Sequence, residues 1–411
     1  MNVQPISGAP GVRRSRQGAR ALLAVVSGAF LLAVTGCGPG AGADDGKGGG
    51  DDGSKRSEAV VGIAPKDGAK DVDTSDGLEV TAEKGRLSSV KVRDSKGNRI
   101  AGKVTEGGKL WKPTGHLAAS TEYTVDAVAE DSEGRQSAEH SSFTTLVPKN
   151  TFVGHYTPEN GAEVGVGMPV SIRFSRGITD PAAVERAVKV KASPAVPVEG
   201  HWFGNDRLDF RPEKYWKPGT EVTLSLNLDG VEGRPGVYGK QVKKVKFTIG
   251  RSQVSTVDAK KKTMTVERDG KVIKTIPITA GAPATTTYNG AMVISEKHEV
   301  TRMNGDTVGF GGEYDIKDVP HAMRLSNSGT FLHGNYWAGS SVFGSVNASH
   351  GCVGLSDIRG GGDNGTPAAW FFNKSILGDV VVVKNSDDKE IAPDNGLNGW
   401  NMDWDEWKAP Q

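Results

Sequence analysis

The stretch Ser349-His350-Gly351-Cys352-Val353 is the most informative part of this 411-residue chain. Cys352 is one of two cysteines, and the other lies near the N-terminus. A thiol attacks as its thiolate and needs a base or a positive group beside it, which His333 or His350 could supply. The glycine at 351 lets the backbone approach a substrate closely and leaves an N–H free to bind an oxyanion. We therefore interpret Cys352 as a nucleophile.

The spacing of the motif residues fits a catalytic pair. Fifteen residues separate His333 from Ser349, enough for one strand to end, a loop to cross the site and a second strand to return. Cys352 could instead be an inert core residue, because free cysteine is among the most buried types, but the preceding Ser-His-Gly disfavours this. His333, His350 and Cys352 could also bind zinc, yet the cysteine, histidine and carboxylate clusters typical of metal sites are missing. We predict neither a metal nor a cofactor.

These residues resemble the signature of the bacterial L,D-transpeptidases (the YkuD-like catalytic domain), a histidine followed some fifteen residues later by Ser-His-Gly-Cys. Residues 323–334 resemble the strand that carries the family's catalytic histidine, and Trp337 falls where mycobacterial-type members often have an aromatic residue. Residues 400–407 resemble the tryptophan-rich tail of that subgroup. The resemblance covers residues 251–411. It departs at Gly354, where the family usually has Asn or Arg.

The resemblance implies acyl transfer through a thioester. In that family the cysteine attacks the third residue of a tetrapeptide stem of peptidoglycan, and D-alanine leaves. The side-chain amine of a diamino acid on a neighbouring stem then takes the acyl group, which gives a 3→3 cross-link. The implied partners are these stem peptides and, as covalent inhibitors, carbapenem β-lactams. Hydrolysis by water would make the chain an L,D-carboxypeptidase, and a non-catalytic cell-wall-binding lipoprotein is a third hypothesis.

The resemblance also implies a role for each motif position. Cys352 is the nucleophile and His333 the general base. The oxyanion-binding and pocket residues are Gly351, His350, Ser349 and Gly334, whose carbonyl region orients the base. The substrate-binding residues are Met323, Ser326, Asn335, Trp337 and Gly354.

Residues 1–36 have the features of a lipoprotein signal peptide. The positive region contains Arg13, Arg14, Arg16 and Arg20. The apolar segment that follows is too short for a comfortable permanent span. Residues 32–37 resemble a lipobox, so we expect a lipid on Cys37 that holds the exported protein on the outer face of the cytoplasmic membrane, facing the cell wall. A cleaved signal with an incidental cysteine is the alternative. Residues 37–58, rich in Gly and Asp, predict a flexible tether.

The composition favours a mainly β chain. Glycine is abundant at 56 residues, and helical periodicity is nearly absent. The net charge of +1 gives no footprint for nucleic acid. We predict two immunoglobulin-like β-sandwiches, at 59–147 and 150–250, then a β-rich catalytic domain at 251–385 with one or two short helices. A tryptophan-rich C-terminal extension follows at 386–411.

A sequence repeat supports the two sandwich domains. Trp111-Lys112-Pro113 recurs as Phe210-Arg211-Pro212, at an offset of 99 residues. The segment at 121–124 recurs at 220–223 with the same offset. We interpret both domains as spacers, because no exposed aromatic cluster is evident. A weak wall-binding platform is the alternative.

Cap and turn signals locate several elements. Asp180 predicts the start of a helix at 181–188, and Thr366 predicts the start of another that buries Trp370 and Phe371. Strands are expected on both sides of the turn at 268–270 and at 380–383.

Three further expectations concern the surroundings of the site. Residues 304–319 should form a mobile loop over it. His321, just before the histidine-bearing strand, should be a solvated loop residue that could edge the substrate groove. Trp400, Trp404 and Trp407 should share one face of a helical turn and cap the sheet of the catalytic domain.

Overall fold

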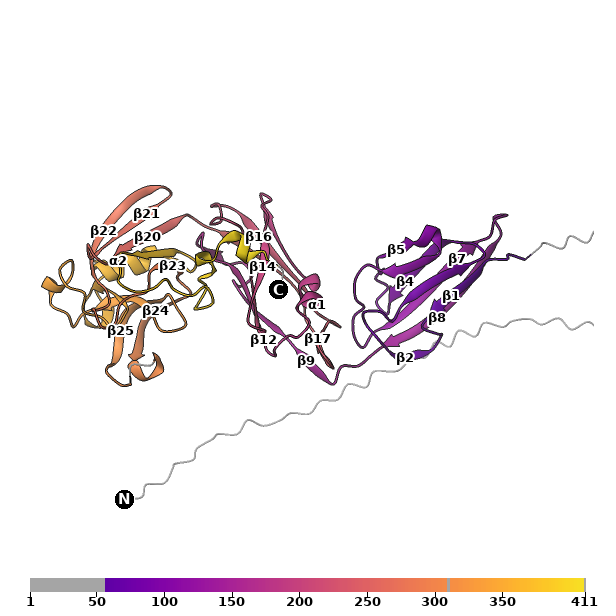
Figure 1. Ribbon diagram of the computed structural model, residues 1–411, viewed down its shortest axis with the longest axis horizontal. Coiled ribbons are helices and arrows are strands. Elements are labelled where there is room, and N and C mark those ends of the chain that lie inside the picture. Colours follow the sequence, from indigo (N-terminus) through magenta and orange to yellow (C-terminus); the bar gives the residue numbers. More distant parts are fainter. Residues whose placement is uncertain (1–55, 309–310, 410–411) are drawn as a thin grey trace, which may run out of the picture. The chain divides into compact units, whose positions relative to one another are not determined.

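The computed structural model describes residues 56–308 and 311–409, and these residues are mainly β (Figure 1). The expected signal peptide, the lipidation site Cys37 and nearly all of the tether lie outside the described residues. Within the described ranges, no helix is long and apolar enough to cross a membrane.

The first sandwich domain consists of two four-stranded sheets, ordered β1-β3-β6-β5 and β2-β8-β7-β4. Alternating apolar residues on the facing sides of the sheets form its core, with Trp111, Tyr123 and Phe143 as the large members. The strands are β1 (Val60–Ala64), β2 (Ala69–Val72), β3 (Glu79–Glu83), β4 (Arg86–Asp94), β5 (Gly102–Thr105), β6 (Leu110–Pro113), β7 (Glu122–Glu130) and β8 (Gln136–Thr145).

The second sandwich domain repeats this topology, with sheets ordered β10-β12-β15-β14 and β11-β19-β16-β13. Trp111 on β6 and Phe210 on β15 occupy corresponding strands, and both are buried, so the sequence repeat is a repeat of core positions. A small third sheet, β17-β18-β9, completes the domain. The strands are β9 (Asn150–Phe152), β10 (Gly154–Thr157), β11 (Glu163–Val164), β12 (Val170–Phe174), β13 (Val188–Ser193), β14 (Glu199–Phe203), β15 (Arg207–Arg211), β16 (Glu221–Asn227), β17 (Glu232–Arg234), β18 (Val237–Gly239) and β19 (Val242–Ile249).

The predicted helix of this domain is confirmed as α1 (Pro181–Ala187). Asp180 caps it, because its side chain accepts a hydrogen bond from the Ala183 backbone N–H at 2.9 Å.

The C-terminal domain, which the sequence predicts to be the catalytic domain, is built on one nine-stranded sheet, ordered β23-β28-β20-β21-β22-β27-β26-β25-β24. The expected turn at 268–270 joins β21 to β22, with Asp269 and Gly270 at φ of 49° and 77°. Strand β28 lies one place from the edge, parallel to β20, which explains its nearly continuous run of valines. The strands are β20 (Gln253–Asp258), β21 (Thr263–Arg268), β22 (Lys271–Thr279), β23 (Gly290–Val293), β24 (Glu296–Asn304), β25 (Asp315–Arg324), β26 (Phe331–Asn335), β27 (Val353–Ser356) and β28 (Val380–Lys384).

Helix α2 (Pro367–Lys374) packs on β25, β26 and β27, the last two of which carry the motif residues. Its cap is Thr366, as predicted, and Phe371 is fully buried while Trp370 is partly buried.

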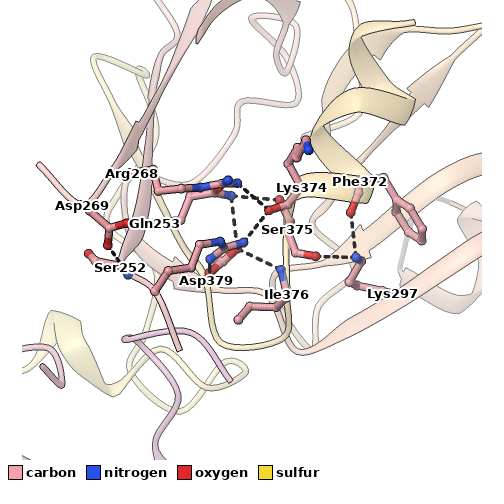
Figure 2. A network of polar contacts seen from close by, with 11 residues as sticks. Ser252, Gln253, Arg268, Asp269, Lys297, Phe372, Lys374, Ser375, Ile376 and Asp379 are labelled. Atoms are coloured by element: carbon pink, nitrogen blue, oxygen red, sulfur yellow. Dashed lines mark hydrogen bonds and ion pairs between the residues drawn. The ribbon is translucent and has the colours of Figure 1, made fainter. Parts of the chain in front are cut away.

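A buried polar network ties the beginning of this domain to the loop after α2 (Figure 2). The Asp379 carboxylate accepts hydrogen bonds from Arg251 at 2.6 and 2.9 Å, from Gln253 at 3.1 Å and from the Ile376 N–H at 2.9 Å. Burial raises the pKa of Asp379, and the Arg251 guanidinium opposes that shift. The network therefore fixes the start of β20 against the loop that leads into β28.

Two expectations about the strands around the site were wrong. Residues 323–334 do not form one strand: β25 ends at Arg324, a turn follows, and β26 carries His333. The loop expected at 304–319 is shorter, because β24 and β25 pair as far as Asn304 and Asp315. Charged residues on the exposed arms of that hairpin hide the apolar alternation by which a strand is recognised.

The tryptophan-rich tail packs mainly against the second sandwich domain. Trp407, in α3 (Trp404–Trp407), is fully buried; its indole N–H donates to the Glu199 carbonyl at 3.0 Å, and its ring stacks on His201. The guanidinium of Arg211 lies 4.3 to 5.3 Å from the centres of the Trp400, Trp404 and Trp407 rings. The predicted cap over the catalytic sheet was therefore wrong about its main partner.

The tail also reaches the edge of the catalytic sheet. Asn398 accepts a hydrogen bond from the Val293 N–H at 3.0 Å, and Asn401 accepts one from the Ala291 N–H at 2.7 Å. Both donors belong to β23, so the tail links this sheet to the second sandwich domain.

Candidate active site

The parallel pair β26 and β27 brings the two motifs together. Leu332 faces Val353 and His333 faces Gly354 in the register, so Cys352, the residue before β27, lies near the strand that carries the histidine. One cavity contains both side chains. It is lined by Met303, Tyr314, Ile316, His333, Asn335, Trp337, Ala348, Ser349, His350 and Cys352.

The Cys352 thiol is buried and protonated at neutral pH. Only 9% of the residue is exposed, and its Sγ donates to the Gly329 carbonyl at 3.6 Å. Burial raises the pKa of the Cys352 thiol to about 11, since the charged thiolate would lose its hydration.

The hydrogen bond of His333 determines which ring nitrogen can act as a base. Nδ1 lies 2.9 Å from the carbonyl oxygen of Gly334, which can only accept, so Nδ1 carries the proton and Nε2 keeps its lone pair. The ring stacks on Trp337 with centroids 5.6 Å apart. Burial lowers the pKa of His333, while the Gly334 carbonyl and the negative charge of Asp357 oppose that shift. The imidazole is therefore held neutral and oriented.

The backbone before the cysteine is shaped by Ser349 and Gly351. Ser349 Oγ donates to the Cys352 carbonyl at 2.6 Å and accepts from the Gly351 N–H at 3.2 Å. Gly351 has a φ of 104°, which side chains disfavour. The N–H of Gly351, which was expected to bind an oxyanion, therefore already makes a hydrogen bond within the motif.

His350 points toward the hairpin β24–β25. Its Nε2 lies 3.1 Å from a Glu313 carboxylate oxygen, and its ring contacts Tyr314 with centroids 5.1 Å apart. It shares the cavity with His333 and Cys352. Among the described residues, no group of three or more histidines, cysteines and carboxylates could hold a metal ion.

Two residues expected to bind substrate are inaccessible. Met323 is fully buried in the core of the catalytic domain. Ser326 is also fully buried, and its Oγ accepts from the Thr330 N–H at 2.8 Å, which closes the turn between β25 and β26. The expectation treated these positions as one strand beside the substrate, whereas the hairpin turns both side chains inward. Asn335 and Trp337 do line the cavity.

Comparisons with known proteins agree with this architecture. Residues 69–232 match the family model described as a bacterial Ig domain, and residues 252–383 match the L,D-transpeptidase catalytic domain. L,D-transpeptidase 2 of Mycobacterium tuberculosis (strain CDC 1551 / Oshkosh) is 32% identical over 399 residues, covering 94% of each chain. The chain belongs to the L,D-transpeptidase family.

Other relatives match smaller parts of this L,D-transpeptidase. L,D-transpeptidase 5 of M. tuberculosis (strain ATCC 25618 / H37Rv) is 30% identical over 352 residues, covering 84% of this chain and 75% of that protein. The solved structure of the LD transpeptidase LdtMt1 in complex with imipenem is 28% identical, with a TM-score of 0.48, and covers 58% of this chain and 100% of that one.

The departure at Gly354 has a steric explanation in this L,D-transpeptidase. A Cβ at this position would lie 2.9 Å from Thr279 Cγ2 and 3.3 Å from Asn335 Nδ2. The space that a side chain at 354 would need is therefore occupied by residues of the two neighbouring strands. Gly354 cannot contact substrate through a side chain, and the carboxamide nearest to this position comes from Asn335.

Two features of this L,D-transpeptidase were missed by the sequence analysis. Tyr314 lines the cavity, and burial raises its pKa to about 12, with the charge of a Cys352 thiolate as a second cause. The sequence feature that could have identified Tyr314 is an aromatic residue within a segment rich in Gly and Asp. His321, which was expected to be solvated, is buried in β25 and paired with Asp357. The two residues are 36 positions apart, so no local sequence pattern predicts the pair.

Proposed function

We propose that this chain is a peptidoglycan L,D-transpeptidase that forms 3→3 cross-links and releases D-alanine from a tetrapeptide donor stem. The observation that carries the proposal is the shared cavity of Cys352 and His333, in which Nε2 of the imidazole keeps its lone pair. Membership of the L,D-transpeptidase family supports the substrate class.

Acyl transfer proceeds in two steps. Nε2 of His333 accepts the thiol proton as Cys352 Sγ attacks the carbonyl carbon of the third stem residue. The C–N bond to D-alanine breaks, the leaving amine takes the proton from the imidazolium, and a thioester remains. The amine of the acceptor stem then attacks the thioester, gives its proton to His333, and the thiol is restored.

The electrostatics support general-base catalysis over a preformed ion pair. Burial raises the pKa of the Cys352 thiol to about 11 and lowers the pKa of His333, so both side chains are neutral before substrate binds. Proton transfer therefore accompanies attack. The tetrahedral oxyanion needs a preorganised donor, and since Gly351 already donates to Ser349, the N–H of Cys352 is the main one.

Carbapenems are proposed as covalent inhibitors, because Cys352 would attack their lactam carbonyl as it attacks the stem peptide. A strained lactam carbonyl presents Cys352 with an electrophile and requires no acceptor. LdtMt1, a relative over 58% of this chain, has been solved in complex with imipenem.

The proposed location is the outer face of the cytoplasmic membrane, with a lipid on Cys37. The apolar segment and lipobox-like residues before Cys37 support this. Fractionation of cells expressing the Cys37→Ala variant tests it: release into the soluble fraction is expected, and retention in the membrane would reject the anchor.

The function is tested with purified stem peptides. Wild-type protein, Cys352→Ser and His333→Ala are incubated with a tetrapeptide donor and a diamino-acid acceptor, and products are separated by mass. The wild type should yield the cross-linked dimer and free D-alanine, and Cys352→Ser neither. Shortened donor without dimer would assign the chain as an L,D-carboxypeptidase, and no turnover by the wild type would favour a wall-binding protein.

A further inference from the structure

A buried histidine–carboxylate pair lies behind the catalytic histidine. His321 Nδ1 is 2.7 Å from Asp357 Oδ2, and the two side chains are 8% and 0% exposed. Burial removes the hydration of both groups, so the presence of such a pair is by itself weak evidence that it stabilises the fold. The mechanism above does not use it, so its presence calls for another reason.

Asp357 is held from three directions. Its Oδ2 is bound by His321, while its Oδ1 accepts from the Ile358 N–H at 2.8 Å and from the Thr366 hydroxyl at 2.9 Å. Thr366 is also the cap of α2, so the carboxylate is fixed to that helix. Every oxygen of Asp357 thus has a protein partner, which leaves the group little freedom to move.

The histidine partner is held in an unusual backbone conformation. His321 lies within β25 and has a φ of 50°, the left-handed region that residues other than glycine seldom adopt. Its ring packs against Phe372 of α2, with centroids 5.1 Å apart, and a Cβ on Gly361 would lie 3.0 Å from its Cε1. Strained backbone persists where surrounding contacts determine it, and functional sites are where it is commonly found.

The carboxylate connects to the base through Gly334. A Cβ on Gly334 would lie 2.0 Å from Asp357 Oδ2, so only glycine allows this approach. Gly334 is also the residue whose carbonyl accepts the Nδ1 proton of His333. The negative charge of Asp357 favours the protonated form of His333 and so opposes the lowering of its pKa.

We propose that Asp357, anchored by His321 and Thr366, is a positioning residue for His333: it packs against Gly334, whose carbonyl orients the ring, and supports the positive charge developing on the imidazole. The inference rests on the proposed cysteine mechanism. In metal sites, the groups that hydrogen-bond to a ligating imidazole and orient it commonly contribute about 10- to 100-fold to metal affinity or activity, and we expect an effect of similar size here.

Several other titratable groups lie near His333, and the test must separate their effects from that of Asp357. Cys352, Tyr314 and His350 share the cavity with His333, and all three are unchanged in the variants tested below. Cys352 and Tyr314 carry their protons at neutral pH because burial raises their pKa values. Asp318 of β25 is paired with Arg359 at 2.8 Å. Asp318 therefore provides a matched control, because it is a nearby carboxylate whose hydrogen bonds come from Arg359 and Tyr336.

The test is the pH dependence of acylation. Wild type, Asp357→Asn and Asp318→Asn are reacted with a carbapenem, and the rate of mass gain on Cys352 is followed from acid to neutral pH together with the melting temperature. Asn removes the charge of Asp357 and keeps the two hydrogen bonds accepted by Oδ1, and its amide N–H can donate to His321 Nδ1 once the ring proton lies on Nε2. Asp357→Asn should slow acylation about tenfold at neutral pH and move the acidic limb of the profile to lower pH. Asp318→Asn should leave the limb in place.

A second variant keeps the proposal open to refutation if Asp357→Asn fails to fold. His321→Gln retains a donor for Asp357 and leaves its carboxylate beside Gly334, so the acidic limb should stay where it is in the wild type. A limb that moves to lower pH in His321→Gln, or an unchanged rate and limb in Asp357→Asn, would overturn the positioning role. Failure of the wild type to form any adduct on Cys352 would instead contradict the underlying mechanism.

Discussion

The reactivity of the Cys352 thiol follows directly from its burial. Burial raises the pKa of this thiol from an ordinary 9.0 to about 11. Two pKa units lower the thiolate fraction about 100-fold at neutral pH, and the thiolate is the reactive form. Alkylation of the folded protein by iodoacetamide should therefore be slow at neutral pH and should rise with pH until it levels near pH 11.

The assay uses the Cys37→Ser variant, in which Cys352 is the single cysteine. Pseudo-first-order alkylation rates are measured by intact mass over a range of pH. The same protein in concentrated urea is the control, because its thiol is hydrated and should titrate near the ordinary value. Restricted access to the cavity lowers the rate at every pH but does not move the inflection.

The position of the inflection decides between two mechanisms. An inflection near pH 11 agrees with a neutral thiol whose proton is removed during attack. An inflection at or below neutral pH would mean that Cys352 and His333 form a thiolate–imidazolium pair before substrate binds. That result would refute the general-base mechanism.

Four further predictions concern single residues. His333→Ala should slow acylation by a carbapenem about 10²- to 10⁴-fold at unchanged melting temperature, and an equal rate would assign the base elsewhere. Trp407→Ala should lower the free energy of unfolding by about 3–5 kcal/mol, whereas Trp337→Ala, at a residue that is 44% exposed, should lower it less; equal effects would contradict the burial of Trp407 against the second sandwich domain. Burial raises the pKa of Asp209 to about 6, so this carboxyl stabilises the fold at low pH and loses that contribution as pH rises from about 4 to 6. Between pH 4 and 6, the free energy of unfolding of the wild type, measured with urea, should fall by about 3 kcal/mol relative to that of Asp209→Asn. If the two proteins show the same pH dependence, this prediction is wrong. Gly354→Asn should destabilise the protein by about 1–3 kcal/mol through overpacking, and an unchanged melting temperature would show that the neighbouring strands yield.

Local signals in the sequence predicted much of the fold. Asp180 and Thr366 cap α1 and α2 as expected, because a cap needs only a side chain within three residues of its N–H partner. The repeat around Trp111 and Phe210 predicted two equivalent sandwiches, since large core residues recur wherever the same strands pair.

Long-range contacts could not be predicted in the same way. His321 and Asp357 are 36 residues apart, and their pairing depends on a left-handed residue within a strand. The partner of Trp407 is a strand 208 residues earlier, and hydrophobicity indicates that a ring is buried without indicating against what. Met323 and Ser326 were predicted to bind substrate from their positions along a single strand, but that segment forms two strands joined by a turn. The turn alters which side chains face the core.

The central claim is that Cys352 carries the acyl group between donor and acceptor. Its most direct test is the intact mass of the protein after exposure to a tetrapeptide donor, first alone and then with an amine acceptor, followed by mapping of the modified peptide. An adduct equal to the donor less D-alanine, located on Cys352 and removed by the acceptor, is the predicted result. Formation of cross-linked product by Cys352→Ser, or an adduct on any other residue, would contradict it.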